Sequence, residues 1–89
     1  MTGQFVTSRA GHDRGTLYIV VAEEGEYVCL SDGRRRTPDR PKKKNRKHIQ
    51  PINASDAGIR EKLVAGKTVR PEEIKFAIRQ FSENQYSKK

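Results

Sequence analysis

Alternating apolar and polar positions in the first half of the chain predict short β-strands. The clearest strand covers residues 16–22, where five of the seven residues are β-branched or aromatic. Because successive side chains of a strand point to opposite faces, Leu17, Ile19 and Val21 share one face. This face suits the interior of a small barrel, and Tyr18 is then expected on the outside.

Shorter runs of β-forming residues predict four more strands. Residues 4–8 and 27–30 have the composition of strands, and residues 47–52 are expected to close the set with Ile49 in the core. Residues 34–37 are expected to return from a turn as an edge strand, because this segment has no apolar face. Five short strands within about fifty residues, with turn residues between them, predict a small barrel rather than a layered sheet.

Glycines mark the turns between these strands. Gly33 follows an aspartate, and this pair supplies the positive φ of a tight turn. Gly11 and Gly15 stand four residues apart around a polar trio. They either form an ordinary hairpin turn or let backbone N–H groups approach a phosphate, and their spacing alone leaves both open. Asp13, between them, is expected to cap the backbone of its own loop rather than contact a ligand.

After residue 53 the apolar spacing changes to that of a helix. Ser55 or Asp56 can cap a first helix that stops at Gly66. Pro71 suits the first position of a second helix. An apolar stripe on this second helix packs on the barrel or on the first helix, or else it faces a partner protein. The stripe consists of Ile74, Ala77, Ile78 and Phe81.

The length of 89 residues predicts one small domain, with the barrel over residues 3–52 and a helical extension over residues 53–86. Cys29 is the one cysteine, so no disulfide can form within the chain, which fits a reducing cytoplasm. The start of the chain lacks the apolar run of a signal peptide, and no stretch approaches the ~18 apolar residues of a membrane span. These features predict a cytoplasmic protein that has no membrane partner.

The distribution of charge changes this picture most. The chain has 19 Lys and Arg against 11 Asp and Glu, a net charge of +8. Residues 34–48 hold nine of the bases and one acid, Asp39, so the whole excess of the chain lies in this segment. Such a concentration predicts a polyanion as partner, and its place between two ordered regions argues against a solvated tail or an import signal. The nine bases are Arg34, Arg35, Arg36, Arg40, Lys42, Lys43, Lys44, Arg46 and Lys47.

The sequence does not indicate catalytic or metal-binding chemistry. Cys29, His48 and Asp32 supply the groups of a nucleophilic triad, but a cysteine in a half-buried strand is expected to be structural. One cysteine and two histidines are too few for a usual zinc site, and the sequence has neither a P-loop nor a dinucleotide fingerprint. We therefore expect no enzyme activity, no metal or other cofactor, and no small-molecule substrate.

Residues 3–33 resemble a KOW motif. The match begins with an apolar pair at residues 5–6 and a Gly-polar-Asp-basic-Gly loop at residues 11–15. It continues with an alternating apolar strand at residues 17–21 and, after a turn, a second strand that starts at residues 27–28.

The sequence PKKKNRKH at residues 41–48 extends the match. The chain resembles small bacterial KOW-domain RNA-binding proteins related to archaeal and eukaryotic large-subunit ribosomal proteins. The resemblance implies an SH3-like β-barrel that binds RNA, often ribosomal RNA, through a loop shaped by Gly11 and Gly15. His12 stands where the family often has Arg or Lys, so the resemblance does not imply a fixed charge there. The loop residues expected to point toward phosphate are Arg9, His12 and Arg14.

The other expected binding residues lie in the basic segment, where Lys and Arg meet phosphates without base specificity. With about half of the nine bases in contact, the logarithm of the binding constant would fall with the logarithm of the salt concentration at a slope of about −3. Tyr18 and Tyr27 either stack on bases, or one of them packs beneath the loops. Gly33 is expected to shape the turn that leads into the segment. The predicted set is Arg34, Arg35, Arg36, Arg40, Lys42, Lys43, Lys44, Asn45, Arg46, Lys47 and His48.

The sequence thus predicts a protein that docks electrostatically on an RNA backbone. Ribosomal RNA or the ribosome, with ribosomal proteins as neighbours, is the expected target. An alternative is a protein-interaction module of the transcription or ribosome-assembly machinery, in which the basic segment holds an acidic protein surface. Double-stranded DNA is a third partner to test, since charge alone does not separate DNA from RNA.

Overall fold

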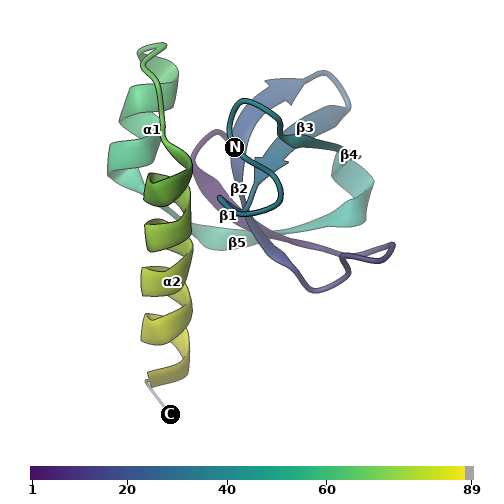
Figure 1. The fold of residues 1–89 in the computed structure, drawn as a ribbon. Helices are drawn as coiled ribbons and strands as arrows, with labels where there is room; N and C mark the ends of the chain where they lie inside the picture. The colour runs from purple at the N-terminus through teal and green to yellow at the C-terminus, as the bar shows by residue number, and fades with distance from the viewer. Residues whose placement is uncertain (88–89) are drawn as a thin grey trace.

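The computed structural model describes residues 1–87, and the side chains of residues 1–84. It contains five antiparallel strands in one sheet, a short 3₁₀ helix and two α-helices (Figure 1). No helix in this described part is both long and apolar enough to cross a bilayer. The elements are β1 (Gln4–Ser8), β2 (Leu17–Glu24), β3 (Tyr27–Ser31), β4 (Lys42–Asn45), η1 (Arg46–His48), β5 (Ile49–Ser55), α1 (Ala57–Val64) and α2 (Pro71–Ser87).

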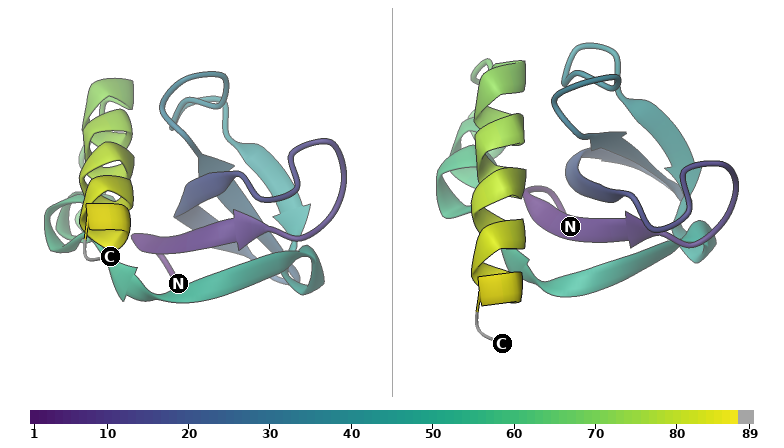
Figure 2. Two further views of the ribbon diagram at one scale, coloured as in Figure 1. Left: turned by 90° about the horizontal axis from the view of Figure 1, so that it is seen from below. Right: turned by 60° about the horizontal axis from the view of Figure 1, so that its bottom comes forward.

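The strands lie in the order β4-β3-β2-β1-β5, so β4 and β5 form the two edges of an open sheet. The three residues of η1 are all that separates these edge strands in the chain, so the end of β4 lies close to the start of β5. The sheet therefore curls strongly, as the two views in Figure 2 show. Antiparallel β-structure followed by two helices is confirmed, whereas closure of the sheet into an SH3-like barrel stays a prediction.

The two faces of the curled sheet are buried by different partners. On one face, Phe5 and Ile19 share a core with residues of α1 and α2. The other face is enclosed by the sheet itself, and Tyr18 lies on this inner face. The predicted orientation of β2 is therefore wrong, because both sets of its alternating residues are apolar and alternation cannot tell which set lies inside. The inner core consists of Val6, Tyr18, Val20, Val28, Leu30 and Ile49.

Residues 34–37 do not form the predicted edge strand, and they belong instead to a loop over residues 32–41. The Asp32 carboxylate accepts the backbone N–H groups of Arg34 at 2.9 Å and Arg36 at 3.0 Å. These bonds fold the chain back on itself. They also use backbone N–H groups that would otherwise donate to a neighbouring strand in a β-sheet. Strand pairing with β3 resumes in β4.

The closing strand also differs from its predicted bounds. It begins at Ile49 rather than residue 47, because residues 46–48 form η1, and it continues to Ser55. Ile49 is buried at the start of the strand, as predicted.

The helices begin near the predicted residues. The Asp56 carboxylate accepts the Ile59 N–H at 2.9 Å and so caps α1, and Pro71 opens α2. The apolar stripe of α2 faces the sheet, where the ring of Phe81 stacks on that of Phe5 with centroids 4.3 Å apart. The stripe is therefore part of the core, and the helices belong to the same folded unit as the strands.

Gly33 packs against the start of α2, and we expect its replacement to be costly. Its φ is +75°, and an added Cβ would lie 2.5 Å from the Pro71 carbonyl oxygen and 2.7 Å from the Lys75 nitrogen. Gly33→Ala is expected to lower the free energy of unfolding by about 2–4 kcal/mol, because a clash with backbone adds to the strain of a left-handed residue. Gly66→Ala is the control, since Gly66 has a φ of +73° and nothing described lies within 4 Å of its added Cβ. Equal losses in urea unfolding would contradict the packing of Gly33.

Candidate nucleic-acid interface

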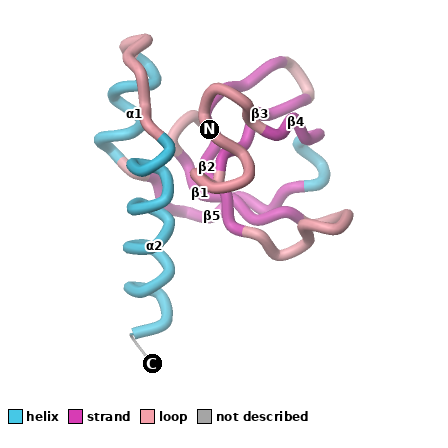
Figure 3. Tube along the Cα trace, viewed as in Figure 1, coloured by secondary structure: helices cyan, strands magenta, loops and turns pink. Residues whose placement is uncertain are grey.

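Two loops that adjoin the start of β2 form the candidate interface, and both are drawn in pink in Figure 3. Loop 9–16 connects β1 to β2, and loop 32–41 connects β3 to β4. Strand β2 pairs antiparallel with both β1 and β3, and Ile19 near its start lies opposite Ser31 at the end of β3. Both loops therefore leave the sheet where β2 begins. The acidic segment 23–26 lies at the other end of β2, so the basic loops and these acids are separated along the strand.

Asp13 is the centre of a side-chain cluster beneath its own loop. Its carboxylate accepts the Lys44 ammonium group at 2.8 Å and the Lys42 ammonium group at 3.0 Å. The Tyr18 hydroxyl donates to it at 2.8 Å, and the Ser8 hydroxyl lies 3.0 Å from Oδ1. The side chains of Asp13 and Lys44 are 13% and 10% exposed, so this ion pair is largely shielded from water. We call these five residues the Asp13 cluster.

The contacts within the cluster fix the charge states of Asp13 and Tyr18. Burial alone would raise the pKa of Asp13, but hydrogen bonds from Lys44, Tyr18, Lys42 and Ser8 outweigh burial and lower it far below its ordinary value. Burial, together with the bond to the Asp13 carboxylate, raises the pKa of Tyr18. Asp13 is thus ionised and Tyr18 neutral near pH 7. The prediction that the Asp13 side chain caps its own loop is wrong, because side chains from β1, β2 and β4 bind the carboxylate instead.

The two tyrosines of the sheet have different surroundings. Tyr18 is 3% exposed, so its ring offers no surface for stacking on a base. Of the two predicted alternatives, Tyr18 is therefore the tyrosine that packs beneath the loops. Tyr27 is 45% exposed, and the Lys43 ammonium nitrogen lies 5.6 Å from its ring centroid. Tyr27 stands at the start of β3, whereas loop 32–41 follows the end of that strand.

Four of the nine bases in residues 34–48 are held in ion pairs. This result was not expected from the sequence, where the segment contains one acid. Hydrogen bonds from Arg46 and from the N-terminal ammonium group lower the pKa of Glu23 to about 2. The pairs are Lys42 and Lys44 with Asp13, Lys43 with Glu24 at 3.0 Å, and Arg46 with Glu23 at 2.8 Å.

The other bases of the segment and those of loop 9–16 make no ion pair among the side chains of residues 1–84. All of them are exposed. Two acids lie in the same loop as four of them. The Asp32 carboxylate is bound to backbone N–H groups, and the Asp39 carboxylate bonds to Thr37, although the charge of the neighbouring Arg40 also lowers the pKa of Asp39. These side chains are therefore able to meet an external anion without first leaving a partner. They are Arg9, Arg14, Arg34, Arg35, Arg36, Arg40 and Lys47, and we call them the free cations.

The remaining polar residues of the predicted site lie in or beside the loops. His12 is exposed in loop 9–16, and His48 is exposed in η1. The His48 carbonyl accepts the Arg9 N–H at 2.8 Å, which joins η1 to the loop. The Asn45 side chain accepts the Lys47 N–H at 3.0 Å, so its carbonyl oxygen caps η1.

Both glycines of loop 9–16 adopt a left-handed backbone conformation. Gly11 and Gly15 have φ values of +87° and +88°, and the Gly15 N–H donates to the Ser8 carbonyl at 2.8 Å. The Arg14 N–H donates back to the Gly11 carbonyl at 3.2 Å, so the loop makes a hairpin turn. The N–H groups of residues 10–13 donate to no acceptor within the part of the chain described, and these donors remain open to solvent or to a ligand.

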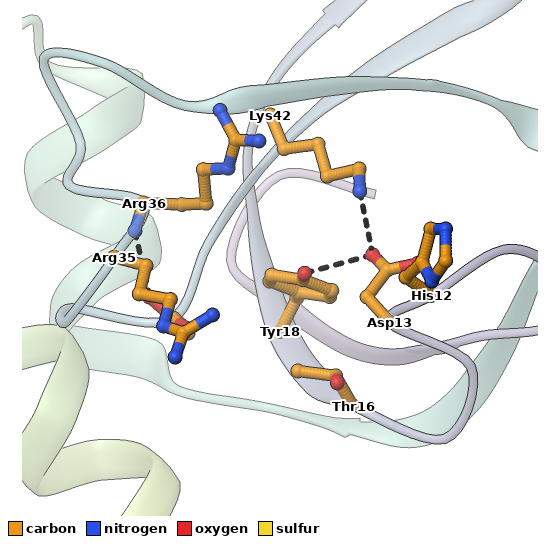
Figure 4. Close-up of a pocket in the computed structure, with 8 residues that line it drawn as sticks. His12, Asp13, Thr16, Tyr18, Arg35, Arg36 and Lys42 are labelled. Carbon is orange, nitrogen blue, oxygen red and sulfur yellow. Dashed lines mark hydrogen bonds and ion pairs between the residues drawn. The ribbon is translucent and has the colours of Figure 1, made fainter.

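A polar pocket of about 390 Å³ lies between the two loops (Figure 4). Arg35 and Arg36 stand on one side of it and His12 stands on the other, with Thr16 beside Tyr18. Tyr18 lies between them, with its hydroxyl bonded to the Asp13 cluster. The pocket thus brings together residues that lie about twenty positions apart in the chain.

No protein-family model and no curated protein sequence matches the chain. The resemblance to KOW-domain proteins therefore stays a prediction.

Cys29 shows no sign of reactivity. It is buried, and burial followed by its contact with Glu24, 3.4 Å from the sulfur, raises the pKa of its thiol. A protonated, shielded thiol is a poor nucleophile, which agrees with the predicted structural role. Among residues 1–87, no three His, Cys, Asp or Glu side chains are grouped in a way that would hold a metal ion.

Sequence reasoning missed the acids that bind the basic segment and the part that Thr16 plays in the pocket. One signal for the Asp13 cluster was present. Lys42 and Lys44 stand two residues apart, and on a strand this spacing places both on the same face. Recognising residues 42–45 as a strand would have shown that these two lysines share an environment that Lys43 does not.

Proposed function

We propose that the protein binds RNA by docking on the phosphate backbone through loops 9–16 and 32–41, with ribosomal RNA or the ribosome as its target. The observation that supports this best is the set of seven exposed free cations on these loops and on η1. Phosphate contacts by Lys and Arg supply most of the affinity in sequence-independent binding. An SH3-like barrel of the KOW type is part of this proposal, and the five-stranded curled sheet is compatible with it.

The ion pairs strengthen the proposal, although they reduce the number of bases available. The Asp13 cluster ties loop 9–16 to β4, so the cations on that loop start from a fixed position. A preformed arrangement loses less conformational entropy on binding than a mobile basic tail would. The acids of segment 23–26 lie at the far end of β2, where Lys43 and Arg46 bind two of them, and they do not repel a phosphate at the two loops. Helix η1 adjoins this segment, because the Arg46 N–H donates to the Glu26 carbonyl at 2.9 Å.

Binding is expected to weaken steeply as salt is added. If all seven free cations met phosphates of single-stranded RNA, the logarithm of the binding constant would fall with the logarithm of the salt concentration at a slope of about −5. We expect about −3 to −5, measured by fluorescence anisotropy with a labelled RNA hairpin. Competition with double-stranded DNA at the same salt concentration separates RNA binding from general polyanion binding. The proposal fails if no RNA is retained at low salt, and retention of an acidic protein alone would favour the interaction module.

A further inference from the structure

The pocket between the loops is built differently from a flat phosphate-binding surface. Arg35 and Arg36 supply guanidinium groups from one side only, while the His12 imidazole lies on the opposite side and the Thr16 hydroxyl lies beside Tyr18 (Figure 4). Guanidinium groups suit the planar, two-point recognition of phosphate oxygens, and hydroxyl and imidazole groups suit the polar edges of a sugar or a base. The pocket therefore offers two kinds of contact at once.

The centre of the pocket is held in place before any ligand arrives. The hydroxyl of Tyr18 and the ammonium group of Lys42 both bind the Asp13 carboxylate, at 2.8 Å and 3.0 Å. Asp32, which also lines the pocket, uses its carboxylate to accept backbone N–H groups of its own loop, including that of Arg36 at 3.0 Å. Neither acid of the pocket is therefore paired with the guanidinium groups of Arg35 or Arg36, and a ligand phosphate would meet both arginines unpaired.

From this arrangement we infer that the pocket accepts one unpaired nucleotide of the bound RNA, with its phosphate at Arg35 and Arg36 and its sugar and base toward His12 and Thr16. The volume of about 390 Å³ lies within the range of sites that enclose small ligands. A continuous A-form duplex keeps its bases stacked and paired, so it has no nucleotide to place there, whereas loops, bulges and ends do. This inference rests on the proposed function, and it adds that the preferred RNA has an unpaired nucleotide.

The chain provides a matched pair of variants for the test. Arg34 and Arg40 belong to the same loop as Arg35 and Arg36 and are also exposed, but they do not line the pocket. Arg35→Ala with Arg36→Ala removes two charges from the pocket, and Arg34→Ala with Arg40→Ala removes the same charge beside it. All four side chains are exposed, so thermal unfolding should confirm that both variants keep the fold.

The experiment compares a labelled RNA hairpin that has an unpaired loop with a blunt RNA duplex of the same number of phosphates, at one low salt concentration. The unchanged protein is expected to prefer the hairpin by about tenfold, the worth of one charge-assisted hydrogen bond. The Arg35/Arg36 variant should lose this preference. The Arg34/Arg40 variant should bind both RNAs more weakly by the same factor, so it should keep the preference for the hairpin.

The outcomes separate the two proposals. If the unchanged protein binds hairpin and duplex equally, the nucleotide pocket is wrong while RNA binding stands, and this result needs no variant. If the Arg35/Arg36 variant keeps the preference for the hairpin to the same extent as the Arg34/Arg40 variant, the inference of a nucleotide pocket is also wrong. If neither RNA binds, the proposed function itself fails.

Discussion

Replacing Asp13 with alanine is expected to destabilise the protein by about 3–5 kcal/mol. The ammonium group of Lys44, on a side chain that is only 10% exposed, would lose its carboxylate partner at 2.8 Å. The hydroxyl of Tyr18 would lose its acceptor in the same buried region. Because small domains have total stabilities of about 5–15 kcal/mol, this loss would leave a marginal fold. Urea unfolding followed by circular dichroism measures it.

Two further variants make this result specific to the cluster. Asp39→Ala removes the same charge from an exposed position in loop 32–41, where the carboxylate bonds to nearby Thr37, and we expect a change within about 0.5 kcal/mol. Lys44→Met combined with Asp13→Ala removes both members of the shielded pair, and it should be less destabilising than Asp13→Ala alone. If Asp13→Ala behaves like Asp39→Ala, the cluster does not hold the fold together.

The contribution of Asp13 also has a defined dependence on pH. Its pKa is lowered in the folded protein, so its stabilisation is present above the unfolded value of about 3.9 and is lost as the pH falls below it. The difference in unfolding free energy between the unchanged protein and Asp13→Ala should therefore shrink from about pH 4 toward about pH 2. Other acids with lowered pKa values, such as Glu23, are present in both proteins and cancel in this comparison.

The features that could be predicted from the sequence are those set by neighbouring residues. Strand β1 was predicted residue for residue, because its β-forming run is bounded by turn residues. The cap at Asp56 and the start of α2 at Pro71 follow from local backbone chemistry, and both are confirmed. The positive φ of Gly33 is local as well, although the turn opens into a longer loop than a hairpin needs.

The features that could not be predicted depend on residues far apart in the chain. Lys44 and its partner Asp13 are 31 positions apart, so a basic segment with one acid gives no local sign of the pair. Which face of β2 lies inside the curled sheet depends on how β5 and the helices pack, so the pattern of β2 alone places Tyr18 on the wrong side. A count of bases can locate a charged segment, but only the fold shows which of them are free to bind.

This distinction decides which charges to reverse. Arg34→Glu, Arg35→Glu and Arg36→Glu together are expected to weaken RNA binding by about a hundredfold or more. Each of these arginines is exposed and makes no ion pair among the described side chains, so each is available to bind a phosphate. The salt slope should fall in magnitude by about two, at about 0.7 for each lost contact. Reversing residues 42–44 instead would also break the Asp13 cluster, so a loss of binding there would not separate recognition from folding.

The control for the triple arginine variant carries the same change in charge on the helical part of the molecule. Arg60→Glu, Lys67→Glu and Arg79→Glu alter exposed residues that have no ion pair within residues 1–87, and they likewise bring the net charge from +8 to +2. If long-range attraction alone governed binding, both variants would lose the same affinity. We expect the helical variant to lose about tenfold at most and to keep its salt slope, since its reversed charges do not contact phosphate. Equal losses in fluorescence anisotropy would mean that loops 9–16 and 32–41 are not the binding surface.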